Sequence, residues 1–205
     1  MGAYNYQDLD FVFRTQQLLK QYHTIKKNNP FSKNYNITLF LNCFVGLLII
    51  PQQHSIQCIP ENELKNGIKK YGINPEDILV IKKRDKKNKG QLLDEIKSFR
   101  NVAKHIRNSI AHNNFKVLST LEKIDRIEFK DYLGEIDKDD PEKNLTFTLT
   151  ITINNLFFYS LMISTKFLNV MAKDIDPRFK NFKKFKNQDL KHKQLYQDIH
   201  DIHIY

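Results

Sequence analysis

The sequence lacks tryptophan altogether and contains only two cysteines. Its 15 phenylalanines and 9 tyrosines supply bulky side chains instead, and a hydrophobic content of 40% is enough to build a core. Cys43 and Cys58 form neither a CxxC pair nor a metal-binding spacing. This excludes a disulfide framework and a thiolate metal cluster, and it fits a reducing cytoplasm.

No apolar run is long enough to cross a membrane. The longest run, residues 37–50, is interrupted by Asn42 and Gly46 and stops before Pro51. A bilayer requires roughly 18 to 20 apolar residues, so this segment is predicted to be a buried helix. The first ten residues are polar and show no apolar signal region. We therefore expect a cytoplasmic protein with no membrane segment.

Acidic residues are outnumbered by basic ones. The 33 lysines and arginines face 23 aspartates and glutamates, which gives a net charge of +10 and a pI near 9.4. Such an excess favours a polyanionic partner, most commonly nucleic acid. Lysine, asparagine and isoleucine are abundant throughout, however, as AT-rich coding would also produce. The charge alone leaves both explanations open.

Hydrophobic periodicity predicts four main helices. They are expected at about residues 6–22, 35–50, 91–112 and 154–172. The third has the clearest pattern, because its apolar residues recur at spacings of three and four and form one stripe. This stripe consists of Leu92, Ile96, Phe99, Ala103, Ile106 and Ile110.

Two segments between the third and fourth helices have the pattern of strands. They cover about residues 124–133 and 145–153, and the second alternates apolar residues with threonines. The economical architecture is mainly α: a four-helix bundle with a β-hairpin between helices three and four and a basic C-terminal tail. We expect one domain over residues 1–205, with the bundle at about 8–172 and a basic extension at 173–205.

The segment from Arg107 to His112 carries the residues best suited to chemistry. At about 100° per residue, a polar face forms opposite the apolar stripe, and Arg107 lies at its boundary. The face comprises Asn101, His105, Asn108 and His112. Such a face could be solvated, or it could be the seam at which a second copy docks.

An arginine and a histidine in this arrangement suit RNA cleavage. A histidine can take the proton of a ribose 2′-hydroxyl or protonate the leaving oxygen. A guanidinium can hold the scissile phosphate with two parallel hydrogen bonds and stabilise its developing charge. That reaction needs no metal and no cofactor. The alternative is that Arg107 and His112 only stabilise the end of their helix.

The motif Arg107-Asn108-x-x-x-His112 resembles the R-x4–6-H motif of the HEPN superfamily, in which a polar residue often follows the arginine. Its position late in the third helix is similar too. Residues 10–15 and 38–48, and residues 111–115 with the hairpin after them, resemble the bacterial, plasmid-associated branch of HEPN nucleases. The resemblance covers roughly residues 8–172 and implies the HEPN bundle.

The resemblance implies a metal-independent endoribonuclease that acts on RNA as a homodimer with a composite cleft. Arg107 and His112 would be the catalytic pair, and Asn108 would position the histidine or the phosphate. Such proteins serve as toxins or in anti-phage defence, so an antitoxin or a defence partner is expected. The alternatives are a non-catalytic RNA-binding or toxin–antitoxin interaction module on the same fold, and a purely structural dimerisation domain.

Other candidate RNA contacts lie beside the motif and in the tail. They are His105, Lys104, Lys183, Lys184 and Lys186. Residues 178–186 interleave rings with positive charges, a pattern that suits single-stranded RNA. The rings recur every three residues, which equally favours packing of one helical face. His192, His200 and His203 lack accompanying cysteines, so a structural tail is favoured over a metal site.

Overall fold

The computed structural model describes residues 7–28, 42–43, 59, 61, 63–64, 72–85, 87–88, 91–120, 123–137 and 139–171. The chain divides into two compact units, one of residues 1–59 and 157–205 and one of residues 60–156. The second unit contains all of the predicted Arg107–His112 motif. The expectation of one domain over residues 1–205 stays a prediction.

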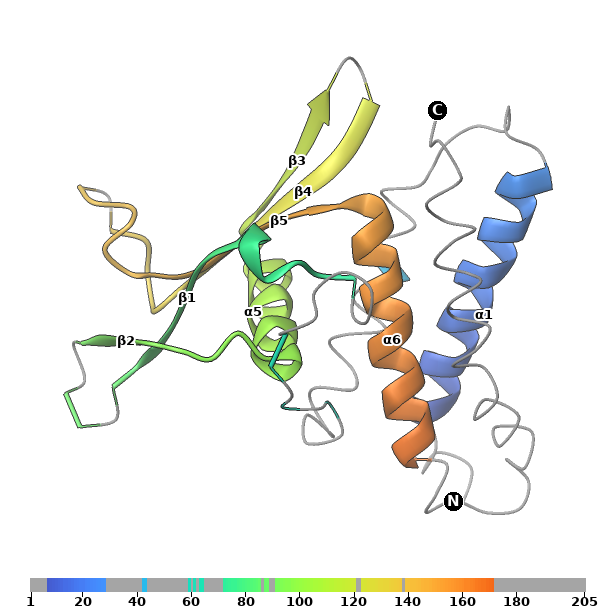
Figure 1. Cartoon of the computed structure of the whole chain (residues 1–205), viewed down its shortest axis with the longest axis horizontal. Coiled ribbons are helices and arrows are strands. Elements are labelled where there is room, and N and C mark those ends of the chain that lie inside the picture. Colours follow the sequence, from blue (N-terminus) through green and yellow to red (C-terminus); the bar gives the residue numbers. More distant parts are fainter. Residues whose placement is uncertain are drawn as a thin grey trace. The chain divides into compact units, whose positions relative to one another are not determined.

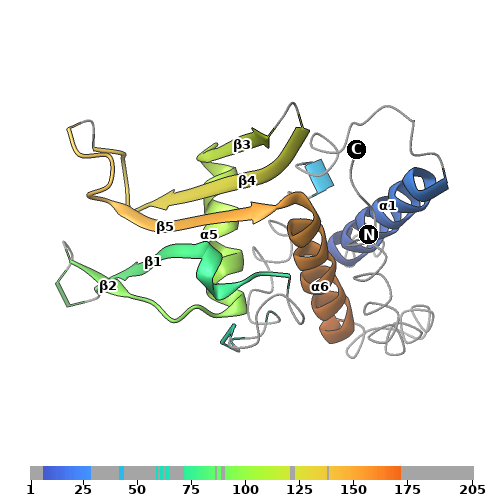
Figure 2. The same ribbon diagram turned by 45° about the horizontal axis from the view of Figure 1, so that its top comes forward.

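The second unit is built on a five-stranded antiparallel sheet with the strand order β2-β1-β5-β4-β3 (Figures 1 and 2). Its elements are η3 (Pro75–Asp77), β1 (Ile78–Arg84), β2 (Leu92–Asp94), α5 (Phe99–Ala111), β3 (Phe115–Thr120), β4 (Lys123–Tyr132) and β5 (Leu145–Thr152). The pairing between the strands farthest apart in sequence joins β1 to β5. Because β5 also pairs with β4, it is the central strand of the sheet.

The prediction of a mainly α four-helix bundle with one hairpin is wrong. The two predicted strands exist as β4 and β5 and pair with each other, but they form the middle of a sheet that β1, β2 and β3 extend. In the sequence, β1 continues from a short apolar run into Lys82, Lys83 and Arg84, a pattern typical of a loop. A register shift between Ile78 and Val80 also interrupts its alternation.

Helix α5 is shorter than predicted because both of its ends are fixed by local hydrogen bonds. Ser98 is the N-cap and accepts a hydrogen bond from the backbone N–H of Asn101 at 3.1 Å. At the other end Asn113 adopts a left-handed φ of 56°. The backbone N–H of Asn113 donates to Ile110 at 3.1 Å and that of Asn114 to Ser109 at 2.7 Å. This Schellman arrangement turns the chain directly into β3.

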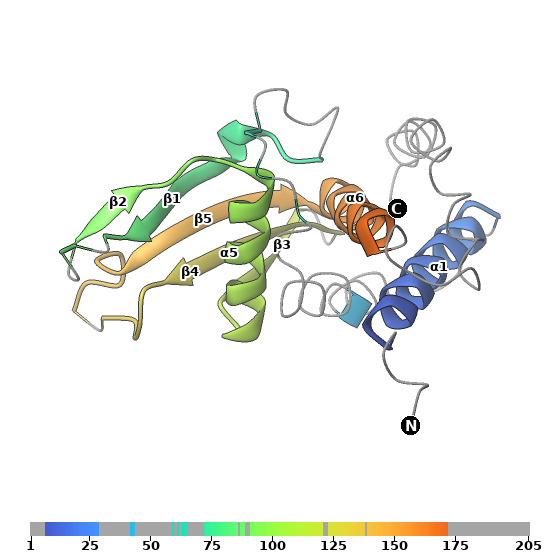
Figure 3. The same ribbon diagram turned by 90° about the horizontal axis from the view of Figure 1, so that it is seen from below.

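The core of the second unit lies where α5 crosses one face of the sheet (Figure 3). The register pairs Phe129 with Leu149 and Ile127 with Ile151, which places these four side chains on the same face. They are at most 1% exposed. The apolar stripe of α5 is buried as well, at Phe99, Val102, Ala103 and Ile106. Helix and sheet thus form one two-layer core.

The first unit contains α1 (Gln7–Asn28) and the residues of α6 (Ile153–Met171) from Phe157 onward. The buried amide of Gln16 donates to the hydroxyls of Ser164 and Thr165 at 3.1 and 2.9 Å. Both helices were predicted and are confirmed. The predicted helix at 35–50 lies outside the described residues except for Asn42 and Cys43, which are helical. None of the described helices is long and apolar enough to cross a membrane.

Candidate functional site

The guanidinium of Arg107 is held by the neighbouring side chain of Asn108. Both Nε and Nη2 of Arg107 donate to Oδ1 of Asn108, at 3.1 and 2.7 Å. Two donors on one oxygen fix the plane of the guanidinium. A guanidinium has five N–H donors, so within the described part of the chain three of them, two on Nη1 and one on Nη2, stay available for a ligand.

The amide of Asn108 is in turn oriented by the sheet. Its Nδ2 donates to Oδ2 of Asp131, on β4, at 2.9 Å. A carboxylate only accepts hydrogen bonds, so the amide must turn its NH2 group to Asp131 and its oxygen to Arg107. The two neighbours of Asn108 therefore agree on a single orientation of the amide.

His105 lies buried between two carboxylates, with 3% of its surface exposed. Its Nδ1 is 2.8 Å from Oδ2 of Asp131, and its Nε2 is 3.0 Å from Oε2 of Glu95. The ring stacks on Phe147 of β5, with centroids 4.9 Å apart and planes 7° from parallel. Since each ring nitrogen faces an acceptor, both must carry a hydrogen, and the ring is an imidazolium.

The charges of this cluster shift the pKa values of its members in opposite directions. Burial lowers the pKa of His105, but the hydrogen bonds and negative charges of Asp131 and Glu95 outweigh it and raise the pKa above its usual value. Burial raises the pKa of Glu95, but the hydrogen bond and charge of His105, with the charges of Lys104 and Lys83, lower it overall. Both shifts favour the charged forms of His105 and Glu95.

The stability of the protein is expected to fall on both sides of a pH window. The raised pKa of His105 contributes stability that is complete below its ordinary value of 6.5 and is lost as pH rises through the folded-state pKa. The lowered pKa of Glu95 contributes stability that is complete above its ordinary value of 4.5 and is lost as pH falls. Urea unfolding across pH should show the alkaline decline in the wild type and in His112→Ala but not in His105→Gln. An unchanged decline in His105→Gln would contradict the assignment.

The predicted polar face of α5 is only partly exposed. His105 and Asn108 meet Asp131 of the sheet, so the expectation of a face directed away from the core is wrong for His105. The expectation failed because His105 binds the buried carboxylate of Asp131, and helical periodicity alone cannot reveal such a partner on a strand. His112 is the exposed C-cap of α5, and its backbone N–H donates to the carbonyl of Asn108 at 2.9 Å. The structure therefore brings Arg107 and Asn108 together and leaves His112 open to solvent.

Three residues of the site were not found from the sequence: Glu95, Asp131 and Phe147. The signal for Asp131 was present, because it continues the core-facing alternation of Ile127 and Phe129, and an acidic side chain at such a position requires a partner. No comparable pattern marks Glu95, which follows β2 in a non-repetitive segment.

The other candidate contacts separate into two groups. Lys104 is partly exposed on α5 and acts on Glu95 through its charge. Lys183, Lys184 and Lys186 lie outside the described residues, as does the rest of the basic extension. The RNA contacts predicted from these lysines stay predictions.

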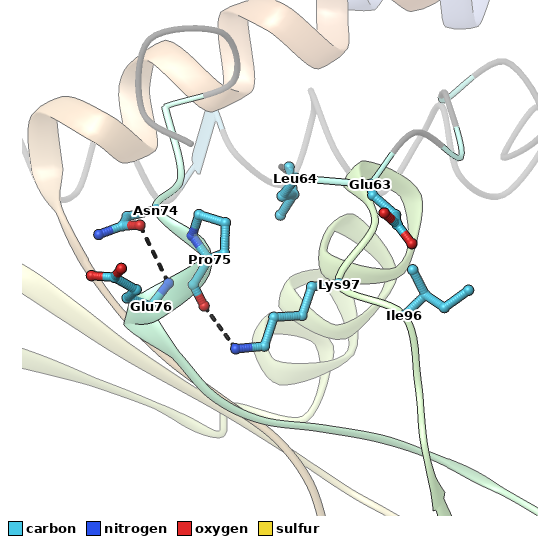
Figure 4. A pocket seen from close by; sticks show the side chains of 7 residues that line it. All are labelled: Glu63, Leu64, Asn74, Pro75, Glu76, Ile96 and Lys97. Atoms are coloured by element: carbon cyan, nitrogen blue, oxygen red, sulfur yellow. Dashed lines mark hydrogen bonds between the residues drawn. The ribbon is translucent and has the colours of Figure 1, made fainter. Parts of the chain in front are cut away.

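A pocket lies near the N-terminal end of α5, where Ile96 and Lys97 come just before the helix (Figure 4). It is lined by Glu63, Leu64, Asn74, Pro75, Glu76, Ile96 and Lys97. The ammonium of Lys97 donates to the carbonyls of Pro75 and Ile78, at 2.8 and 2.7 Å. Helix α5 begins at Phe99, and at about 1.5 Å per residue Arg107 lies about 12 Å and His112 about 20 Å along it from this end. The pocket is thus distant from Arg107 and His112, and its lining contains two glutamates. We therefore treat it as distinct from the candidate site.

Comparison with known proteins identifies the class. The sequence matches a HEPN family over residues 1–162, a range that includes the Arg107–His112 motif and the whole sheet. The chain is therefore a HEPN protein, and the resemblance seen in the motif is confirmed. More narrowly, it belongs to the family described as HEPN pEK499 p136. No curated protein and no solved structure matches it.

Proposed function

We propose that this protein is a metal-independent endoribonuclease of HEPN type. Arg107 holds the scissile phosphate, His112 transfers protons, and Asn108 orients the arginine. The observation that carries the proposal is the pair of hydrogen bonds from Arg107 to Asn108, one helical turn before an exposed histidine. Membership in a HEPN family supports the same assignment.

The helix geometry explains how these side chains can share one ligand. Asn108 and His112 are four residues apart, so they lie on the same side of α5 on successive turns. The two bonds to Asn108 draw the guanidinium of Arg107 toward this side. His112 ends the helix and is exposed, which lets its ring reach a phosphodiester held at Arg107.

The chemistry requires two proton transfers. One imidazole removes the proton of a ribose 2′-hydroxyl, and the resulting oxygen attacks the neighbouring phosphorus. The bond from phosphorus to the 5′-oxygen breaks, and a second acid protonates that oxygen, leaving a 2′,3′-cyclic phosphate and a 5′-hydroxyl. A homodimer would supply both groups as two copies of His112, and two copies of Arg107 would stabilise the charge on phosphorus. In this proposal the enzyme serves as a toxin or in anti-phage defence. It acts in the cytoplasm, together with an antitoxin or a defence partner.

Cleavage of a labelled RNA mixture in the presence of EDTA tests the proposal. The wild type should cut, and His112→Ala and Arg107→Ala should each lower the rate about 100-fold or more. Arg126→Ala is the matched control, since Arg126 lies on β4 with its side chain 57% exposed; it should stay within about twofold of the wild type.

Two outcomes would overturn the proposal. Cleavage by His112→Ala at the wild-type rate would remove His112 from the reaction, and loss of wild-type cleavage in EDTA would contradict metal independence. Binding of RNA by the wild type without cleavage would instead support the alternative, a non-catalytic RNA-binding or toxin–antitoxin module.

A further inference from the structure

Asp131 connects the buried cluster to the motif. Its Oδ2 accepts hydrogen bonds from Nδ1 of His105 at 2.8 Å and from Nδ2 of Asn108 at 2.9 Å. Its Oδ1 accepts the backbone N–H of Tyr132 at 3.0 Å. The side chain is only 6% exposed. Asp131 is therefore held rigidly, and both of its oxygens have defined partners.

We propose that Asp131 is a positioning residue for Arg107, acting through Asn108, and that His105 and Glu95 hold Asp131 in place. This inference rests on the proposed function, in which Arg107 clamps the phosphate. The path of contacts runs from Glu95 to His105, to Asp131, to Asn108 and to the guanidinium. The hydrogen bonds on this path are between 2.7 and 3.1 Å long.

Every contact on this path has only one possible polarity. The carboxylates of Glu95 and Asp131 accept, and the imidazolium of His105 donates on both sides. Asn108 must then present its NH2 group to Asp131 and its oxygen to Arg107. Without the charge of Asp131, the amide could rotate and turn a donor toward the donors of Arg107. The guanidinium would lose its fixed plane.

A neutral amide between Asp131 and Arg107 also preserves the charge that the reaction needs. A carboxylate bound directly to the guanidinium would form an ion pair and compete with the RNA phosphate for the same donors. Asn108 orients the guanidinium with its oxygen while carrying no charge of its own. The negative charge of Asp131 faces the imidazolium of His105, which Asp131 shares with Glu95. The arrangement thus orients the arginine through a neutral amide instead of a carboxylate.

The direct test is the NMR signal of the Arg107 Nε–H, identified by its disappearance in Arg107→Lys. Asp131→Asn should shift this signal and speed its exchange with water, because the orientation of Asn108 is no longer enforced. Asn108→Ala should do the same while leaving the Glu95–His105–Asp131 cluster intact, so it also serves if Asp131→Asn folds poorly. Glu128→Gln, a partly buried acidic position on the same strand, is the matched control and should leave the signal unchanged.

The kinetic test is a double-mutant cycle on RNA cleavage. Asp131→Asn should lower kcat about tenfold to 100-fold, with a smaller effect on KM. If Asp131 acts through Asn108, adding Asp131→Asn to Asn108→Ala should produce no further loss. Effects that multiply in the double variant would show an independent structural role and overturn the proposal, as would an unchanged Arg107 signal in Asp131→Asn. A wild type that does not cut RNA would end the proposed function, while the NMR signal still decides whether Asp131 positions Arg107.

Discussion

Replacing His105 by alanine is expected to lower the free energy of unfolding by about 3 to 5 kcal/mol. The change leaves the carboxylates of Glu95 and Asp131, whose side chains are only 10% and 6% exposed, on either side of an empty space with no cation between them. It also removes the ring that stacks on Phe147. Breaking a buried ion pair costs more than the pair contributes, because the remaining charges stay desolvated. Urea denaturation at pH 7, followed by circular dichroism, measures the loss.

His112→Ala is the matched control for this experiment. It removes the same side chain from the same helix, but at an exposed position, and it should change the free energy of unfolding by no more than about 0.5 kcal/mol. Equal losses in the two variants, or no loss in His105→Ala, would contradict the buried cluster. Together with the cleavage assay, the pair separates the two histidines: His105 is expected to govern stability and His112 to govern the reaction.

The part of the fold that the sequence predicts is the part that depends on local patterns. The alternation of Leu145 to Thr152 identifies β5, and the stripe through Phe99, Ala103 and Ile106 identifies α5. The apolar stripe also begins too early, at Leu92 and Ile96. These residues share the helical spacing by coincidence, and Leu92 instead pairs with Arg84 in the β1–β2 ladder.

The sheet was missed because it depends on contacts between distant residues. Strand β1 meets β5 through pairs such as Ile81 with Phe147, which no window of neighbouring residues contains. The basic end of β1 has the composition of a loop, and only the partner strand makes it extended. The resemblance to HEPN proteins identified the family correctly, but it supported a helical bundle, whereas the described residues of the second unit form a helix packed on a five-stranded sheet.

The candidate site also has a part that local sequence patterns reveal and a part that depends on contacts between distant residues. Arg107, Asn108 and His112 are close in sequence and could be found from a short motif. Their supporting residues come from a strand and a segment that the register brings to α5: Asp131 pairs with Phe147 on β5, and this places both beneath His105. His105 therefore looked like a surface residue in the helical projection and is a core residue in the structure.

Phe147→Ala is expected to lower the free energy of unfolding by about 3 to 5 kcal/mol. Phe147 is fully buried on the central strand, it is paired with Asp131 and Ile81, and it carries the ring of His105. Alanine leaves a cavity between sheet and helix that the two layers cannot close. Phe147→Leu retains most of the volume and should cost about 1.5 kcal/mol or less. Chemical denaturation at a fixed pH compares the two.

Leu79→Ala is the control, because Leu79 lies on the neighbouring strand β1 but is 73% exposed; its replacement should change stability by no more than about 0.5 kcal/mol. The comparison also tests the architecture. If β4 and β5 were a peripheral hairpin on a helical bundle, Phe147 and Leu79 would have similarly small effects. If β5 is the centre of the sheet, Phe147→Ala should weaken the support of His105 as well, and the alkaline decline in stability that depends on this histidine should become shallower in the same variant.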